Sequence, residues 1–268
     1  MENTNLKKSA NLLVDELLED GEFDQKIVKS FYSKDTLSSD IFQTVDNSYK
    51  MHESVRDKLL NVANAFIDFL GIKFFIYDVF LTGSLANFNW SEFSDVDLHI
   101  LIDMDELSGE KNSPMVQQIL KEFFKTKKKT WNSNHNIKIK NYDVEISVQD
   151  VNESHVSSGV YSILNDKWLI EPHPGKENID EKTILDKGME YATLIDDLVE
   201  KSKAGVDVSM DIDEIKRKLK NFRSSGLEKG GEYSYENLTF KLLRRNGYIE
   251  KLMNLKKSVV DKNLSLPQ

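Results

Sequence analysis

The chain has no cysteine and only four prolines among its 268 residues. The absence of cysteine excludes disulfide bonds and metal sites built on thiolates. No stretch approaches the run of about 18 apolar residues that a membrane-spanning helix needs, and the first residues, Met1 to Lys8, contain no apolar signal core. Internal repeats and low-complexity tracts are also absent. We therefore expect a cytoplasmic protein with no membrane partner.

The composition supports a folded domain with an uneven charge distribution. Hydrophobic residues make up 39% of the chain, enough to form a core in one domain or in two closely joined ones. The net charge is −9, yet residues 121–140 carry seven lysines and one acid, and residues 214–262 carry 13 basic and 6 acidic residues. Two interpretations remain open for these basic segments. They are solvated helix faces, or they balance a triphosphate or guide a polyanionic acceptor.

The most informative stretch runs from Thr82 to Leu98 and reads TGSLANFNWSEFSDVDL. The aromatic and branched residues before it predict a buried strand over 74–82, which breaks at Gly83 and Ser84. A glycine lets the backbone approach a triphosphate closely, and a serine can cap the short helix that follows. Gly83 and Ser84 are therefore candidate phosphate-binding residues.

A pair of carboxylates follows the Gly-Ser turn in a predicted strand over 95–102. Because side chains alternate across a strand, Asp95 and Asp97 share one face while Val96 and Leu98 occupy the other. Two carboxylates this close repel each other unless cations lie between them. Their natural ligands are one or two Mg²⁺ ions that also hold the phosphate oxygens of a nucleoside triphosphate. A lone Asp-x-Asp motif usually lies on a solvent-exposed strand face and binds no metal. Here the preceding turn at Gly83 and Ser84 favours the metal role.

This arrangement of apolar strand, Gly-Ser, a gap of ten residues and Asp-x-Asp resembles the DNA polymerase β-like nucleotidyltransferase superfamily. The specific motifs cover about residues 50–150. The resemblance implies an α+β fold, with a small mixed β-sheet nucleotidyltransferase core, N-terminal helices and a C-terminal helical domain. It also implies an enzyme that uses Mg²⁺, with two ions expected, to move a nucleoside monophosphate from an NTP such as ATP to an acceptor hydroxyl, releasing pyrophosphate.

The superfamily pattern needs a third carboxylate on a later strand, and residues 137–148 supply it. One face of this predicted strand is apolar throughout: Tyr142, Val144, Ile146 and Val148. The opposite face carries Asp143, Glu145 and Ser147. Glu145 is the better match because apolar residues frame it, and Asp143 remains the alternative. In the superfamily this carboxylate helps to bind the catalytic metal and draws the proton from the attacking hydroxyl.

We expect three parts along the chain, namely an N-terminal helical segment at 1–50, the nucleotidyltransferase core at 51–175 and a C-terminal helical domain at 176–268. Leu6, Leu13 and Leu17 supply the first apolar positions of the N-terminal segment. The expected elements are a helix at 52–70, strands at 74–82, 95–102 and 137–148, a helix from Pro114 to about Lys129, and helices at 182–202, 211–224 and 234–260.

Two further sets of residues have open roles. Lys241 and Arg244 lie in the densest part of the C-terminal basic segment and are candidates for contact with the γ-phosphate. His155 follows the last core strand, and a structural role is favoured because the chemistry of the superfamily needs no histidine.

The core motifs do not name the acceptor. The basic segments slightly favour RNA or another nucleic acid over a protein or a small molecule. Small molecules are the acceptors of the aminoglycoside adenylyltransferases, which share the Gly-Ser and Ser-Asp-x-Asp pattern. A different class of function is a nucleotide-binding module without turnover. Three clustered negative charges argue against it, because a domain released from catalysis has no physical need of them. The base preference and the oligomeric state do not follow from the sequence.

Overall fold

A computed structural model describes residues 23–109, 113–153, 157–175 and 179–266. The chain divides into two compact units, Ser33–Lys176, called here the sheet unit, and Met1–Tyr32 with Glu177–Gln268, called the helical unit. The three leucines expected to begin an N-terminal helix and His155 lie outside the described residues.

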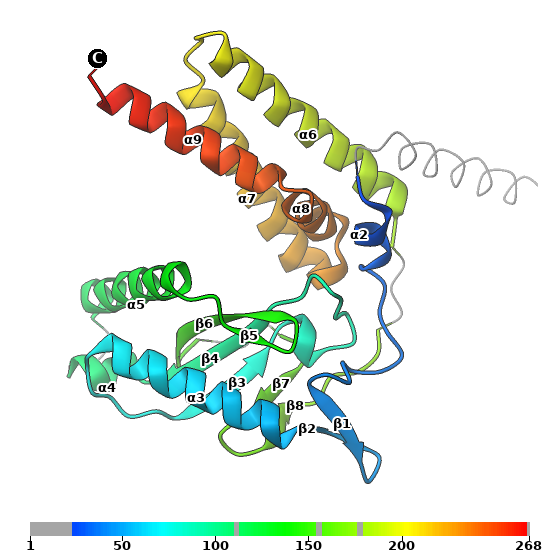
Figure 1. The fold of residues 1–268 in the computed structure, drawn as a ribbon, viewed down its shortest axis with the longest axis vertical. Coiled ribbons are helices and arrows are strands. Elements are labelled where there is room, and N and C mark those ends of the chain that lie inside the picture. Colours follow the sequence, from blue (N-terminus) through cyan, green and yellow to red (C-terminus); the bar gives the residue numbers. More distant parts are fainter. Residues whose placement is uncertain (1–22, 110–112, 154–156, 176–178, 267–268) are drawn as a thin grey trace, which may run out of the picture. The chain divides into compact units, whose positions relative to one another are not determined.

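The sheet unit is built on a mixed six-stranded sheet in the order β5-β6-β4-β3-β7-β8. Its strands are β3 (Asp78–Thr82), β4 (Val96–Ile102), β5 (Lys138–Ile139), β6 (Tyr142–Asp150), β7 (Val160–Ser162) and β8 (Lys167–Ile170) (Figure 1). Strands β4 and β6 run parallel, and the other neighbouring pairs are antiparallel. The expected α+β class with a small mixed sheet is confirmed.

The helices of the sheet unit are α3 (Glu53–Leu70), the short 3-10 helix η1 (Ser84–Ala86), α4 (Met104–Ser108) and α5 (Pro114–Asn134). The apolar positions of α3 recur at helical spacing and are buried, and the helix ends at Gly71, whose φ of 72° is left-handed. Helix α5 begins with proline at its first turn, as the sequence predicts. Phe66 of α3 and Trp131 of α5 meet edge to face at 5.5 Å within the same core.

The N-terminal prediction of helices up to residue 50 is wrong at its end. Residues 42–51 form a hairpin of β1 (Phe42–Val45) and β2 (Ser48–Met51), with Phe42 opposite Met51. The two turn residues, Asp46 and Asn47, both have positive φ, 49° and 62°. This is the backbone of the two-residue turns that favour hairpins, and aspartate and asparagine tolerate it better than other side chains.

Two predicted strands also differ in extent. Residues 137–148 are two strands, because Lys140 adopts a φ of 56° and β5 folds back onto β6. Strand β3 begins at Asp78 rather than at residue 74, and Phe75 is 63% exposed. The aromatic composition of residues 74–77 predicts a buried strand, but these residues precede the strand and Phe75 lies at the surface.

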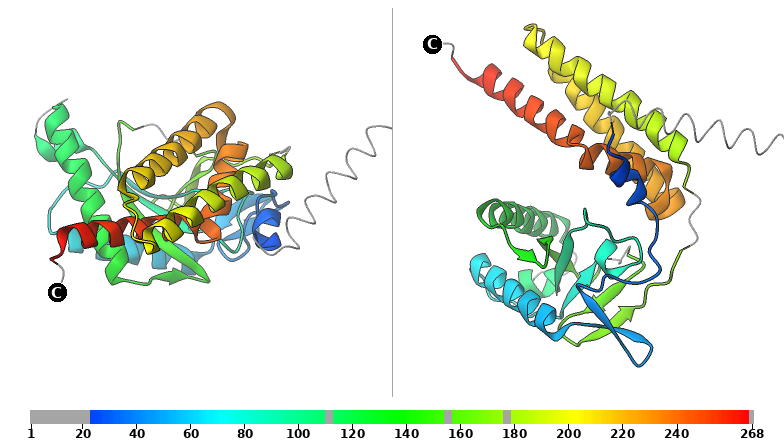
Figure 2. Two further views of the ribbon diagram at one scale, coloured as in Figure 1. Left: turned by 90° about the horizontal axis from the view of Figure 1, so that it is seen from above. Right: turned by 45° about the vertical axis from the view of Figure 1, so that its right-hand side comes forward.

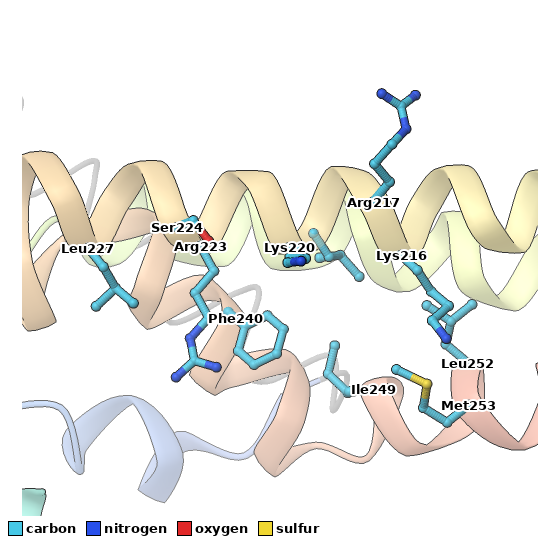
Figure 3. Close-up of a pocket in the computed structure, with 11 residues that line it drawn as sticks. Lys216, Arg217, Lys220, Arg223, Ser224, Leu227, Phe240, Ile249, Leu252 and Met253 are labelled. Atoms are coloured by element: carbon cyan, nitrogen blue, oxygen red, sulfur yellow. The ribbon is translucent and has the colours of Figure 1, made fainter. Parts of the chain in front are cut away.

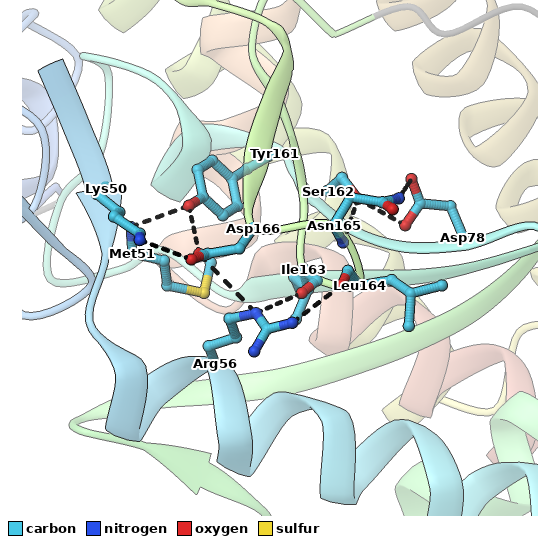
Figure 4. A network of polar contacts seen from close by, with 10 residues as sticks. All are labelled: Lys50, Met51, Arg56, Asp78, Tyr161, Ser162, Ile163, Leu164, Asn165 and Asp166. Atoms are coloured by element: carbon cyan, nitrogen blue, oxygen red, sulfur yellow. Dashed lines mark hydrogen bonds and ion pairs between the residues drawn. The ribbon is translucent and has the colours of Figure 1, made fainter.

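A polar network fastens the hairpin, α3 and the turn between β7 and β8 (Figure 4). The Tyr161 hydroxyl donates to Asp166 Oδ1 at 2.8 Å and accepts from the Met51 backbone N–H at 3.3 Å. The Lys50 ammonium lies 2.9 Å from Asp166 Oδ2, and Arg56 Nε lies 3.8 Å from Asp166 Oδ1. Burial raises the pKa of Tyr161 to about 12, and the hydrogen bond to Asp166 adds to it.

The helical unit contains α2 (Gln25–Lys29), α6 (Glu181–Lys203), α7 (Ser209–Gly230), the 3-10 turn η2 (Gly231–Tyr233), α8 (Tyr235–Arg245) and α9 (Tyr248–Leu264). Figure 2 shows α6, α7 and α9 as long helices grouped around α8. The expected single helix over 234–260 is interrupted at Gly247, whose φ of 81° is left-handed. At Gly188 of α6 the backbone approaches Leu242 of α8 so closely that a Cβ there would lie 2.7 Å from its Cδ2.

Among the described helices, none is long and apolar enough to cross a membrane.

We expect Asp166→Asn to destabilise the sheet unit by about 1 to 2 kcal/mol at pH 7, because it removes the charge that Lys50 and Arg56 face. Burial alone would raise the pKa of Asp166, but the hydrogen bonds from Lys50 and Tyr161 and the nearby positive charges outweigh it and hold the pKa low. The contribution is therefore full above the unfolded pKa and is lost as the pH falls through the lower folded pKa.

Urea unfolding of wild type and variant at pH 7 and below about pH 4 measures this difference. Glu122→Gln is the matched control, since Glu122 is exposed and forms an ion pair with Lys125 of its own helix. A difference for Asp166→Asn that grows on acidification would contradict the account.

Candidate active site

Asp97 and Glu145 are direct neighbours in the sheet. They are Cα partners in the parallel pairing of β4 with β6, so their side chains leave the same face. Along β4 buried and partly exposed residues alternate strictly, and Asp97 is on the partly exposed face while Val96 and Leu98 are fully buried. The register therefore places the Asp97 and Glu145 side chains next to each other on one face of the sheet.

Asp95 and Asp143 are placed less centrally. Asp95 lies one residue before β4 and is partly buried. Asp143 has its register partner in β5, at Lys138, and forms an exposed ion pair with it at 3.1 Å. Within the described part of the chain, no group of three or more His, Asp or Glu side chains is arranged to hold a metal ion. The structure thus brings Asp97 and Glu145 together without gathering a third carboxylate beside them.

The Gly-Ser turn lies directly against Asp97. Strand β3 ends at Thr82, which is the register partner of Asp97 in β4. Gly83 follows with a φ of 74°, and a Cβ on it would lie 1.9 Å from Asp97 Oδ2. Only glycine allows this backbone conformation and this approach together. The predicted turn is therefore in contact with one of the two paired carboxylates.

Ser84 does not cap a helix as the sequence predicted. It is the first residue of η1, whose N-cap position is Gly83 and which has no side-chain cap. Its hydroxyl instead donates to Ser94 Oγ at 2.8 Å, and Asn87 Nδ2 donates to the Gly83 carbonyl at 2.9 Å. These bonds fix the turn from both sides, because Ser94 directly precedes Asp95.

Lys128 of α5 is a site residue that the sequence analysis placed only in a basic segment. Its ammonium donates to Glu145 Oε2 at 3.2 Å and to Ser147 Oγ at 3.3 Å. It therefore neutralises the carboxylate next to Asp97. The sequence indicates that the predicted helix at 114–129 carries several lysines. The spacing of these lysines does not identify which of the seven in residues 121–140 contacts Glu145.

The basic segment at 121–140 is largely paired within the sheet unit. Four of its lysines form ion pairs: Lys121 with Glu153, Lys125 with Glu122, Lys128 with Glu145 and Lys138 with Asp143. Lys127 donates to the Phe69 carbonyl at 3.4 Å and lies 4.8 Å from the centroid of the Phe69 ring. The segment therefore presents far less positive charge than its composition suggests.

His99 continues the partly exposed face of β4 beyond Asp97. Its ring stacks on Phe80 at 5.2 Å, and Nδ1 lies 3.1 Å from Gln149 Oε1. This side chain is oriented from both adjacent strands. Strand alternation could have identified His99, because it lies two residues after Asp97 and therefore on the same face of β4.

A polar pocket of about 500 Å³ adjoins Glu145. It is lined by Asn132, Ser133, Asn134, His135, Asn136, Ile137, Asp143, Val144 and Glu145. Among the described residues, the buried Asn132 Oδ1 has no hydrogen-bond partner. A buried acceptor without a partner costs free energy, so Asn132 is held in place by the packing around it.

Lys241 and Arg244, the candidate γ-phosphate contacts, lie on α8 of the helical unit. Burial lowers the pKa of Lys241, and the guanidinium groups of Arg245, Arg244 and Arg223 act in the same direction, against Glu232. Arg244 is exposed. Their role towards the carboxylates of the sheet unit remains a prediction.

Comparison with known proteins adds little to this geometry. No protein-family model and no curated protein matches the chain. Among solved structures, the STING-associated CdnE c-di-GMP synthase from Capnocytophaga granulosa is 13% identical, with a TM-score of 0.23 and coverage of 80% of this chain and 84% of that one. The CdnE cyclic dinucleotide synthase of Elizabethkingia meningoseptica, solved with GTP and Apcpp, is 16% identical, with a TM-score of 0.20 and coverage of 89% and 82%. Likenesses at these TM-scores carry no argument about the function of this chain.

Gly83→Ala should lower the free energy of unfolding by more than Gly71→Ala. Gly71 has φ 72° and ψ 14°, the left-handed helical region, which alanine enters at a cost of about 1 kcal/mol. Gly83 has φ 74° and ψ −161°, a region open essentially only to glycine, so an alanine there is strained further. A Cβ at Gly71 meets nothing within 4 Å, whereas a Cβ at Gly83 collides with Asp97. Chemical denaturation of the two variants measures the excess, to which the backbone strain and the contact with Asp97 both contribute, and equal losses would contradict both.

Proposed function

We propose that the protein is a Mg²⁺-dependent nucleotidyltransferase that moves a nucleoside monophosphate from an NTP to an acceptor hydroxyl. The observation that carries this proposal is the in-register pair of Asp97 and Glu145 with the Gly83 turn pressed against Asp97. A backbone turn suited to phosphate and a pair of carboxylates suited to metal are thereby held within one strand spacing of each other.

Asp95, Asp97 and Glu145 are the residues that would hold the metal. Carboxylate oxygens are the ligands Mg²⁺ prefers. Asp97 and Glu145 supply them from adjacent strands, and Asp95 lies one residue before β4. When bound, the ions supply positive charge to the attacking and departing oxygens of the phosphoryl transfer. The backbone at Gly83 and Ser84 cradles the phosphates, and Lys241 and Arg244 are the proposed contacts of the γ-phosphate. Glu145 accepts the proton of the attacking hydroxyl.

The acceptor that the sheet unit favours is a small polar molecule. The pocket beside Glu145 is lined by amides, a hydroxyl, an imidazole and the carboxylates of Asp143 and Glu145. Such a wall hydrogen-bonds hydroxyl or amino groups and supplies little attraction for a polyanion. Since most lysines of residues 121–140 are paired, the earlier preference for a nucleic-acid acceptor loses one of its two supports.

A nucleotide-binding module without turnover is the second candidate, and the Lys128 ion pair is the observation that favours it. An ammonium on Glu145 provides without metal part of the positive charge that a catalytic ion would bring. In the enzyme, Lys128 has to release Glu145 when the metal binds. In a module without turnover the pair persists.

Incubation of the protein with each labelled NTP and Mg²⁺, with and without small polyhydroxyl acceptors and total RNA, tests the proposal. We expect pyrophosphate release from wild type, loss of activity below detection in Asp97→Asn, and a loss of about 10² to 10⁴ in Glu145→Gln, the range for a general base. Glu122→Gln is the matched control and should remain active, because Glu122 pairs with Lys125 on the exposed surface of α5 and does not line the pocket. Equal activity of wild type and Asp97→Asn would refute the proposal.

Lys128→Met should tighten Mg²⁺ binding severalfold, because it removes a positive charge 3.2 Å from Glu145 Oε2. The effect is moderate since both side chains are partly exposed to solvent, which screens the interaction. Calorimetric titration with Mg²⁺ measures it without any need for turnover. Lys125→Met serves as control, as Lys125 pairs with Glu122 on the surface of α5. Weaker Mg²⁺ binding in Lys128→Met would mean that the lysine holds Glu145 in its metal-binding position.

A further inference from the structure

The helical unit contains a second pocket, of about 490 Å³, that is open to solvent and lined by residues of α7, α8 and α9 (Figure 3). All its lining residues belong to the helical unit, so the pocket is complete within that unit. Its volume is within the range of small-molecule sites, which are lined mainly by apolar side chains with a few placed polar groups.

One wall of this pocket is cationic. Lys216, Lys220 and Arg223 follow one another at helical spacing along α7, over a length of about 10 Å at 1.5 Å per residue. No acidic side chain occurs among the described residues that line the pocket. On the same helix Lys218 is paired with Glu214 at 2.8 Å, whereas Lys216 and Lys220 have no ion-pair partner in the described part of the chain.

The facing wall is apolar. Phe240 of α8 and Ile249, Leu252 and Met253 of α9 lie opposite the cationic side chains in Figure 3. Met253 is 45% exposed, a high value for a methionine in a helix that packs against three others. The apolar wall favours contact with an apolar group, and the cationic wall favours contact with an anion. A ligand that carries both an apolar group and an anionic group therefore fits this pocket.

Arg223 is the most closely held cation of the pocket. Its Nε donates to Asn237 Oδ1 at 3.2 Å, and its guanidinium carbon lies 4.6 Å from the centroid of Phe240. Asn237 is itself fully buried and donates to the Glu232 carbonyl at 2.7 Å. The guanidinium is thus fixed in orientation beside an aromatic ring, with its terminal amino groups available to a planar anion.

We propose that this pocket binds an organic anion with an apolar body, whose phosphate or carboxylate head contacts Arg223 and Lys220 and whose body packs on Phe240 and Met253. The Arg223 guanidinium orients the anionic head of the ligand, and the Lys220 ammonium adds positive charge. The α9 residues exclude water from the apolar body of the ligand. Nucleoside monophosphates and medium-chain fatty carboxylates share this chemistry. This proposal does not rest on the proposed transfer reaction.

Fluorescence titration of the full chain with 1-anilinonaphthalene-8-sulfonate, an aromatic sulfonate, tests the site. We expect saturable binding at one site per chain, with a dissociation constant about tenfold higher in Lys220→Glu. Arg217→Glu is the matched control. It makes the same charge change on the same helix, but Figure 3 shows the Arg217 side chain directed away from the other lining residues. Far-UV circular dichroism and thermal melting verify that both exposed-site variants remain folded.

Displacement of the probe by guanosine monophosphate or by decanoate supports the proposal and distinguishes the two sources of the anion. The proposal is overturned if the probe does not saturate, if Lys220→Glu and Arg217→Glu weaken binding equally, or if neither competitor displaces the probe. Met253→Glu gives an independent check from the apolar wall, since it places a negative charge where the body of the ligand packs. It should weaken probe binding at least as much as Lys220→Glu, and unchanged binding would also overturn the proposal.

Discussion

The parallel pairing of β4 with β6 is the constraint on which the candidate site depends. Parallel strands keep equivalent residues level with each other, so Asp97 and Glu145 project from one face at one strand spacing. Like charges at that distance repel, and the fold has to offset the repulsion. In this structure Lys128 does so at Glu145, while the Gly83 backbone packs against Asp97. Because Glu145 is already paired with the Lys128 ammonium, a metal ion bound at Glu145 would take the place of that ammonium.

This view explains why the surrounding residues are arranged as they are. The opposite faces of β4 and β6 are buried against the core that α3 and α5 help to form, which fixes the strands and therefore the carboxylates. Helix α5 contributes Trp131 to that core and Lys128 to the site, so the packing of one helix positions the ammonium that faces Glu145. The asparagine-rich end of the same helix then lines the pocket beside Glu145. Core, cation and pocket thus depend on a single helix.

Much of the sheet unit follows from the sequence because its signals are local. Alternation assigns Asp97 and Glu145 to the partly exposed faces of their strands, and Gly83 marks a turn that no other residue would tolerate. The register between β4 and β6 does not follow, since it depends on pairing across some fifty residues of chain. The hairpin at 42–51 was missed because the Asp46-Asn47 turn lacks the glycine of the commonest hairpin turns.

The charge pattern was the least reliable guide. Residues 121–140 are basic in composition, but three of their lysines pair with carboxylates outside the segment. These carboxylates belong to Asp143 and Glu145 of β6 and to Glu153 of the following loop. Ion pairs that are distant in sequence decide whether a lysine faces solvent or a partner. The same reasoning favours the α7 pocket as a real cationic site, since there Lys216 and Lys220 lack such partners among the described residues.

The most direct test of the central claim is a crystal structure of the protein soaked with Mn²⁺ and a non-hydrolysable NTP analogue, with diffraction recorded at the manganese absorption edge. The account predicts an anomalous peak bounded by Asp95, Asp97 and Glu145, with the Lys128 ammonium no longer bonded to Glu145. A structure in which the manganese binds elsewhere, or in which Lys128 still pairs with Glu145 beside a bound nucleotide, would contradict it.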